Sequence, residues 1–127
     1  MKPRTALATA GALAVVGALV APVPASADGV CDDNHFCLYE DDDYHGQRAQ
    51  FDIGTGPVDL TKVRWAGGNS YVTDGASSMK NLTGHTVHLY DAADCSGGSG
   101  YDAKPHSVDT DLTNNWFDNT ASCLQFS

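Results

Sequence analysis

The chain has 127 residues, of which 16 are acidic and 7 are basic, so its formal net charge is −9 at neutral pH. Nucleic acids and anionic membranes require a basic face on their protein partners, and this composition therefore argues against both. An acidic surface suits solubility, the binding of cations or a basic partner protein.

The first 27 residues have the features of a secretory signal peptide. Lys2 and Arg4 form a basic start, residues 6–21 form an apolar run that is short for a membrane span, and residues 25–27 form an A-x-A cleavage site. We therefore expect cleavage before Asp28 and secretion to the extracellular space. An uncleaved membrane anchor is the alternative interpretation.

Residues 28–127 form one predicted domain of 100 residues. All 16 acidic residues but only five of the seven basic residues lie in it, so its formal charge is −11. A domain this small buries a modest fraction of its surface, and covalent or metal cross-links are expected. Four cysteines in a short exported chain predict two disulfides and allow three pairings. A zinc site is the alternative, although the chain contains no C-x2-C pair.

Hydrophobic and polar residues alternate along the domain with a period of two. Apolar residues occupy positions 49, 51 and 53, positions 87 and 89, and positions 124 and 126. Glycine, aspartate, asparagine and serine interrupt these runs at short intervals, as turns require, and we find no convincing helical stripe. The pattern predicts an all-β domain of about eight short strands in a sandwich or barrel.

The second half of the domain repeats two motifs of the first half. Residues 39–46 read Y-E-D-D-D-Y-H-G and residues 90–97 read Y-D-A-A-D-C-S-G, with the tyrosine and the glycine at the same spacing. A second pair follows, T-D-G-A-S-S-M at residues 73–79 and D-N-T-A-S-C-L at residues 118–124. The glycine permits a hairpin that folds back over its own sheet. The domain is therefore predicted to be a tandem duplication of one β motif.

The repeat also favours one pairing of the cysteines. Tyr44 and Ser78 of the first copy are both replaced by cysteine in the second copy, at Cys95 and Cys123. A paired change suggests that the two positions touch in each repeat, so we predict a disulfide between Cys95 and Cys123. Ser78 would hydrogen-bond the folded hairpin at the equivalent place. The other predicted disulfide closes a tight N-terminal loop and joins Cys31 to Cys37.

The hairpin motif and the later S/T-S segment together resemble the repeat of the βγ-crystallins. The resemblance covers residues 37–126. It implies one domain of two Greek-key motifs in two four-stranded antiparallel sheets, with repeat 1 at about 36–83 and repeat 2 at about 84–127. With the export signal and the N-terminal C-x5-C, the chain is also similar to a family of secreted actinobacterial peptidase inhibitors, typified by the Streptomyces metalloproteinase inhibitor.

The resemblance to βγ-crystallins implies two sites for Ca2+. In the calcium-binding members, the S/T-S loops of the two repeats exchange ligands, and hard oxygen ligands of this kind suit Ca2+. The alternative is that these residues only cap turns, and Thr73 and Cys123 depart from the family pattern. The implied ligands are Ser77 with Asp118, Asn119 and Thr120 at one site, Ser122 with Asp74 and Gly75 at the other, and backbone oxygens near Glu40 and Asp91.

Three functions remain open at this stage. The family resemblance implies a secreted peptidase inhibitor that acts on a secreted protease, in particular a metalloprotease. A rigid exposed loop would limit the entropy lost on docking, and the candidates are residues 62–69, which offer Arg64 and Trp65, and residues 96–105. A calcium-stabilised extracellular protein without a protease target is the second function, and a toxin-like or cell-surface binding module is the third. The sequence assembles no nucleophile, base and oxyanion site, so we expect a protein that is not an enzyme. We also expect it to be a monomer.

Overall fold

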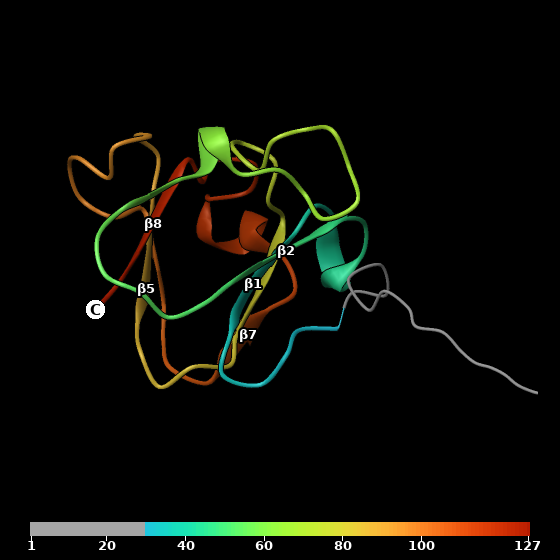
Figure 1. Cartoon of the computed structure of the whole chain (residues 1–127), viewed down its shortest axis with the longest axis horizontal. Coiled ribbons are helices and arrows are strands. Elements are labelled where there is room, and N and C mark those ends of the chain that lie inside the picture. The colour runs from blue at the N-terminus through green and yellow to red at the C-terminus, as the bar shows by residue number, and fades with distance from the viewer. Residues whose placement is uncertain (1–29) are drawn as a thin grey trace, which may run out of the picture.

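The computed structural model describes residues 30–127 of the chain (Figure 1). The predicted signal peptide and its cleavage site lie outside the described residues. Within the described part, no helix is long and apolar enough to cross a membrane.

Eight short strands form two four-stranded antiparallel sheets. The strands are β1 (Phe36–Tyr39), β2 (Arg48–Phe51), β3 (Val58–Asp59), β4 (Ser78–Asn81), β5 (Val87–Tyr90), β6 (Tyr101–Ala103), β7 (Ser107–Asp109) and β8 (Cys123–Phe126). Three 3-10 helices connect them: η4 (Asp42–Tyr44), η5 (Leu60–Lys62) and η6 (Leu112–Asn115). One sheet has the order β2-β1-β4-β7 and the other β3-β8-β5-β6. The predicted all-β fold of two four-stranded antiparallel sheets is confirmed.

Each sequence repeat gives its third strand to the sheet of the other repeat. β3 follows β2 in the first repeat but pairs with β8, where Val58 lies opposite Leu124. β7 follows β6 in the second repeat but pairs with β4, where Lys80 lies opposite Val108. Neither repeat completes a four-stranded sheet with its own strands. The two Greek keys therefore interlock, and the ends of β4 and β8 that carry the S/T-S motifs are brought together.

The hydrophobic core lies between the two sheets. In β5, Val87 and Leu89 are buried whereas His88 and Tyr90 are partly exposed, in agreement with the alternation in the sequence. Ile53, predicted to continue the alternation of Ala49 and Phe51, is 37% exposed because β2 ends at Phe51. The largest fully buried core side chains are Phe36, Leu38, Leu60, Met79, Leu89, Leu112 and Leu124.

β1 is buried on both of its faces. Phe36 points into the main core, where its ring centroid lies 6.2 Å from that of Phe51 and 6.4 Å from that of Phe126. Cys37 and Tyr39 alternate with the core residues and form a second, smaller cluster with Cys31, Tyr44 and Leu82. The disulfide between Cys31 and Cys37 covers this outer face, so the N-terminal cross-link serves as part of a second core.

Candidate functional site

The folded hairpin of repeat 1 is fastened by a serine. Ser78 Oγ donates to the carbonyl of Asp41 at 2.6 Å and accepts from the backbone N–H of Tyr44 at 3.0 Å. The ring of Tyr44 packs against Tyr39 at a centroid distance of 5.5 Å. Gly46 has a φ of +76°, and a Cβ there would lie 2.7 Å from Asp41 Oδ2. The hairpin therefore requires glycine at this position for both conformation and space.

The folded hairpin of repeat 2 is fastened by a disulfide instead. Cys95 and Cys123 are bonded, with their Cα atoms 5.2 Å apart. Cys31 and Cys37 form the other disulfide, with a Cα separation of 6.0 Å, so both bonds have the predicted pairing. In the chain-entropy model the disulfides, which join cysteines 28 and 6 positions apart, contribute about 3–4 and about 2 kcal/mol to the free energy of unfolding.

The S/T-S loops of the two repeats bind each other across the domain. Ser122 Oγ donates to Asp74 Oδ1 at 3.0 Å, and Ser77 Oγ donates to Asn119 Oδ1 at 3.4 Å. The backbones also exchange hydrogen bonds, since the N–H of Asp74 donates to the carbonyl of Ala121 and that of Asn119 to the carbonyl of Ala76, both at 2.9 Å. Asp74 and Asn119 have left-handed φ values of +56° and +57°. The interlocked strands thus create two equivalent hydroxyl–oxygen pairs.

The other residues of the implied calcium sites differ in their burial and in their hydrogen-bond partners. Asp118 Oδ1 is buried and has no hydrogen-bond partner among residues 30–127. The Thr120 hydroxyl donates to the carbonyl of Asp118 at 3.0 Å. Gly75 supplies only backbone, and a Cβ there would lie 3.4 Å from the Trp65 ring. Glu40 Oε2 accepts from the Gln47 amide at 3.4 Å, and Asp91 is exposed.

The donor set around these loops fits a hard cation. It consists of hydroxyl, amide, carboxylate and backbone oxygens, the ligand types that Ca2+ prefers. The described residues contain no group of three or more His, Cys, Asp or Glu that could hold a metal, so a cation at either loop would need hydroxyl, amide or backbone oxygens in addition to a carboxylate. Asp42 is exposed, but partial loss of hydration raises the pKa of its carboxyl, and the nearby carboxylates of Asp111 and Asp118 raise it further. Negative charge is therefore concentrated beside Asp118.

Residues 63–72 form an exposed loop whose ends are tied together, called here the 63–72 loop. The N–H of Val72 donates to the carbonyl of Val63 at 2.8 Å, and the N–H of Trp65 donates to that of Ser70 at 3.1 Å. The side chain of Trp65 is 3% exposed and anchors the loop in the core. Trp65, which the candidate loop offers together with Arg64 in the sequence, is therefore not available to a partner.

Two side chains of the 63–72 loop face solvent and contact each other. Arg64 is exposed and pairs with Tyr71 across an isolated β-bridge. Its guanidinium carbon lies 5.0 Å from the centroid of the Tyr71 ring, and its Nη2 donates to the Tyr71 hydroxyl at 3.2 Å. Tyr71 is 43% exposed. The pairing of Arg64 with Tyr71 was not predicted, because it depends on the bridge that closes the loop.

The second candidate loop, residues 96–105, is shorter than expected. Residues 101–103 form β6, which separates residues 104–105 from the loop before the strand, residues 96–100, with the sequence S-G-G-S-G. The N–H of Ser96 donates to Asp94 Oδ1 at 3.0 Å. A Cβ on Gly100 would lie 2.2 Å from the Phe117 ring, so glycine is required there. This loop has no large side chain that could enter a peptidase subsite.

A serine, a histidine and an aspartate form a hydrogen-bonded chain on the outer face of β5 and β6. His88 Nδ1 lies 2.7 Å from Asp102 Oδ1, and His88 Nε2 lies 2.9 Å from Ser127 Oγ. Ser99 Oγ also donates to Asp102 Oδ1, at 2.6 Å. The order of the groups resembles that of a catalytic triad, but Ser127 is exposed on the surface. We interpret these hydrogen bonds as a structural contact that holds Ser127 against β5.

The interlocked sheets and the fold-back hairpins define the class of the fold. The structure is similar to a βγ-crystallin domain from work on the evolution of the eye-lens fold, with a TM-score of 0.62 and 21% identity over 78% of this chain and 93% of that chain. It is also similar to a βγ-crystallin from Ciona intestinalis, with a TM-score of 0.56 and 22% identity over 73% of this chain and 99% of that chain. Spherulin 3a from Physarum polycephalum gives a TM-score of 0.55 and 19% identity over 79% and 88% of the two chains. The domain has the βγ-crystallin fold.

The sequence places the chain in a particular family of proteins with inhibitory function. Residues 24–101 match the model of peptidase inhibitor family I36, and the chain belongs to this family. No curated protein sequence matches it. Membership of this family, together with the fold, indicates a non-enzymatic, peptidase inhibitor-like protein, as the sequence predicted. The family match includes the 63–72 loop and the Cys31–Cys37 disulfide.

Proposed function

We propose that this protein is secreted and inhibits an extracellular peptidase through the 63–72 loop. The single observation that carries the proposal is the rigidity of an exposed loop within the matched segment. Two cross-loop hydrogen bonds and the buried Trp65 restrain its backbone, while Arg64 and Tyr71 remain accessible. A loop that is ordered before docking loses little conformational entropy on binding, which favours affinity.

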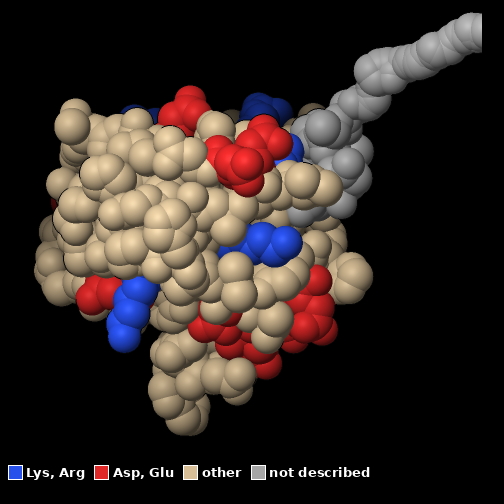
Figure 2. Space-filling view, turned by 90° about the horizontal axis from the view of Figure 1, so that it is seen from below, with Lys and Arg blue, Asp and Glu red and all other residues tan. Residues whose placement is uncertain are grey.

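The chemistry of the loop favours contact with an acidic region of the peptidase. Arg64 carries one of only five basic charges in residues 28–127, and Figure 2 shows basic side chains lying apart from one another among groups of acidic ones on one face. Its guanidinium already lies over the Tyr71 ring, so the two side chains offer one preordered surface of a cation and an aromatic ring. Because Trp65 is buried, the residue after Arg64 cannot extend into a substrate channel. We therefore propose contact that blocks access to the peptidase rather than a substrate-like cleavage site.

The proposal is tested by measuring the loss of peptidase activity against increasing amounts of residues 28–127. Thermolysin-like metalloproteases are tested first, because the family resemblance implies that class, followed by trypsin-like and subtilisin-like serine peptidases. The proposal predicts stoichiometric inhibition of one class, and the variants Arg64→Ala and Tyr71→Ala should weaken it at least tenfold. Lys62→Ala is the matched control, since it removes an exposed basic side chain outside the loop. Equal inhibition by all three variants would exclude the 63–72 loop.

We propose as a second function that the S/T-S loops bind Ca2+ and stabilise the domain. Support comes from the paired hydroxyl–oxygen contacts and from Asp118 Oδ1, a buried oxygen without a hydrogen-bond partner among residues 30–127. Such an oxygen is costly to bury and would be satisfied by a cation. Ser77, Asn119 and Asp118 would hold one ion, and Ser122 and Asp74 would hold the other.

Thermal unfolding in EDTA, in millimolar Mg2+ and in millimolar Ca2+ tests this second function. A ligand that binds only the native state raises the midpoint once its concentration exceeds the dissociation constant. We expect a rise in Ca2+ that Mg2+ does not reproduce and that Ser77→Ala reduces. Ser107→Ala is the control, because that hydroxyl donates to the carbonyl of Lys104 and lies outside both loops. An unchanged midpoint in Ca2+ would show that these residues only cap turns.

A further inference from the structure

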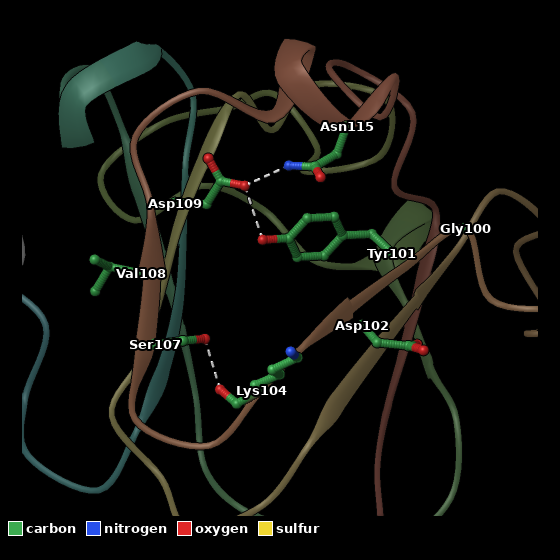
Figure 3. Close-up of a pocket in the computed structure, with 8 residues that line it drawn as sticks. All are labelled: Gly100, Tyr101, Asp102, Lys104, Ser107, Val108, Asp109 and Asn115. Atoms are coloured by element: carbon green, nitrogen blue, oxygen red, sulfur yellow. Dashed lines mark hydrogen bonds between the residues drawn. The ribbon is translucent and has the colours of Figure 1, made fainter.

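A polar cavity lies between the free edges of the two sheets (Figure 3). β6 is the terminal strand of one sheet and β7 is the terminal strand of the other. The volume of the cavity is about 420 Å³, which lies within the range of about 300–1,000 Å³ for sites that bind small ligands. The residues that line the cavity include Tyr101, Lys104, Ser107, Asp109 and Asn115.

The carboxylate of Asp109 is held in one orientation inside this cavity. Asp109 Oδ2 accepts from the Tyr101 hydroxyl at 2.8 Å and from the Asn115 amide at 2.7 Å, and Oδ1 accepts from the N–H of Asp111 at 3.0 Å. A carboxylate has about four acceptor positions, so one remains free on Oδ1. Burial raises the pKa of Tyr101 and the bond to Asp109 raises it further, so the phenol stays protonated and remains a donor.

The cavity also contains hydrogen-bonding groups that are not used by other protein groups, and these include both donors and acceptors. The ammonium of Lys104 makes no ion pair with a carboxylate within residues 30–127. Asn115 retains a free amide N–H and its carbonyl oxygen, and Tyr101 retains acceptor positions on its oxygen. Asp102 points away from Asp109, towards His88 and Ser99 (Figure 3). The lining therefore carries charges of both signs, those of Lys104 and of Asp102 and Asp109, so neither an anion nor a cation is favoured by a single-sign site.

An exposed tryptophan follows Asn115 in the chain. The side chain of Trp116 is 93% exposed, and its φ of +60° is left-handed, which is an unusual conformation for a bulky residue. Its backbone N–H caps η6 by donating to the carbonyl of Thr113 at 3.0 Å. The backbone is thus restrained while the indole ring remains in water, and contact with an apolar ligand surface would stabilise it.

We propose that the cavity between β6 and β7 is a binding site for a neutral saccharide, such as the end of a polysaccharide chain, and that the indole of Trp116, which follows the lining residue Asn115 in the chain, extends this site beyond the cavity. Sugar hydroxyls both donate and accept, which matches the mixed set offered by Lys104, Asp109 and Asn115. The C–H face of a sugar ring would pack on the indole. An extended peptide added to the free edge of β7 is the competing occupant, and it would bind through the strand backbone rather than through these side chains.

The proposal is tested by calorimetric titration of residues 28–127 with chitotriose, cellohexaose and xylohexaose. We expect binding to at least one of them, and Trp116→Ala and Asn115→Ala should each weaken it at least tenfold. Trp116 is exposed, so its replacement leaves the core intact, and circular dichroism checks the fold of every variant. Tyr71→Ala is the matched control, because it removes a partly exposed aromatic ring from the 63–72 loop.

Three outcomes would overturn the proposal. The first is the absence of heat with all three saccharides at millimolar concentration. The second is saccharide binding that Trp116→Ala and Asn115→Ala leave unchanged, since that would place the site elsewhere. The third is binding of an unstructured peptide, but of no saccharide, that Val108→Pro on the β7 edge abolishes, which would identify strand addition. Peptidase inhibition is measured separately and does not depend on any of these results.

Discussion

The two repeats fold back their first hairpin in the same way but fasten it by different bonds. In repeat 1, Ser78 forms hydrogen bonds to the backbones of Asp41 and Tyr44. In repeat 2, a disulfide between Cys95 and Cys123 occupies the equivalent positions. Hydrogen bonds in one repeat and a disulfide in the other thus fasten the same folded hairpin, and the two residue positions involved differ together between the repeats.

The surroundings of the two hairpins differ in a corresponding way. In repeat 1 the ring of Tyr44 packs on Tyr39, and the Lys80 ammonium lies 4.4 Å from the centroid of the Tyr44 ring. Gly46 is crowded by Asp41, whereas Gly97 in repeat 2 has no atom within 4 Å of a Cβ position. The first hairpin is therefore held by aromatic, cation–π and serine contacts, whereas the second combines a disulfide with backbone hydrogen bonds such as that from the N–H of Cys95 to the carbonyl of Ala92.

Removal of the repeat 2 disulfide should have the largest effect on this comparison. The double variant Cys95→Ser, Cys123→Ser should lower the free energy of unfolding by about 3–4 kcal/mol, because the disulfide restricts a long loop in the unfolded chain. Urea unfolding measures the loss. The variant Cys31→Ser, Cys37→Ser is the control and should lose about 2 kcal/mol, since its loop is shorter. A larger loss in the control would contradict the loop-length argument.

Removal of the serine from repeat 1 should have an intermediate effect. Ser78→Ala deletes the hydroxyl and leaves the N–H of Tyr44 and the carbonyl of Asp41 without it, so we expect a loss of about 1–3 kcal/mol in urea unfolding. Ser99→Ala is a matched control, because its hydroxyl binds the exposed side chain of Asp102. A loss as large as that of the disulfide variant would show that the Ser78 hydrogen bonds stabilise repeat 1 as much as the disulfide stabilises repeat 2, and would contradict the expected order.

Alanine at the two hairpin glycines should separate backbone strain from crowding. Gly46 and Gly97 both have a φ of +76°, so each alanine variant should lose about 1–2 kcal/mol from backbone strain. Gly46→Ala should lose more than Gly97→Ala, because only its Cβ meets a neighbour, at 2.7 Å from Asp41 Oδ2. The difference between the two thermal midpoints measures the crowding. Equal midpoints would mean that Asp41 moves aside freely.

The smallest effect should be a difference in how the carboxyl groups of Asp42 and Asp102 make the free energy of unfolding depend on pH. Partial loss of hydration and the charges of Asp111 and Asp118 raise the pKa of the exposed Asp42 carboxyl. Its ionised form therefore destabilises the fold slightly at neutral pH, because solvent screens an exposed charge, and this destabilisation is relieved as pH falls through the raised pKa. Hydrogen bonds from Ser99 and His88 lower the pKa of Asp102, so its contribution is present above the unfolded pKa and is lost as pH falls through the lowered one.

Asparagine variants measured by urea unfolding at neutral and acidic pH test these signs. Asp42→Asn should stabilise the domain at neutral pH, and Asp102→Asn should destabilise it there. Both differences should shrink at a pH below the lowered pKa of Asp102, where the carboxyls are protonated. A destabilising effect of Asp42→Asn at neutral pH would contradict the proposed concentration of negative charge.

Much of the fold follows from local sequence patterns. The alternation of Val87 and Leu89 with polar neighbours predicts a half-buried strand, because side chains alternate between the two faces of a sheet. The paired replacement of Tyr44 and Ser78 by cysteines indicates the Cys95–Cys123 bond, because contact constrains both positions at once. The end of β2 before Ile53 was not predictable, since strand length depends on the partner strand.

The candidate sites could be predicted only in part. The motif at residues 118–124 predicts a loop with oxygen ligands, but its contact with Ser77 and Asp74 depends on the exchange of β3 and β7 between the sheets. The burial of Trp65 and the exposure of Arg64 result from the closure of the 63–72 loop. The cavity around Asp109 had no signal in the sequence, because its walls belong to the edges of two different sheets.

The sequence by itself therefore determined the β class, the duplication, the cysteine pairing and the family of this protein, because each depends on spacing and residue type along the chain. The tertiary structure alone decided which side chains are presented together: Arg64 with Tyr71, Asp109 with Tyr101, and His88 with Ser127. The physical reason is the exchange of strands between the repeats and the closure of loops. These bring together residues whose contacts depend on sheet order, and local periodicity carries no information about sheet order.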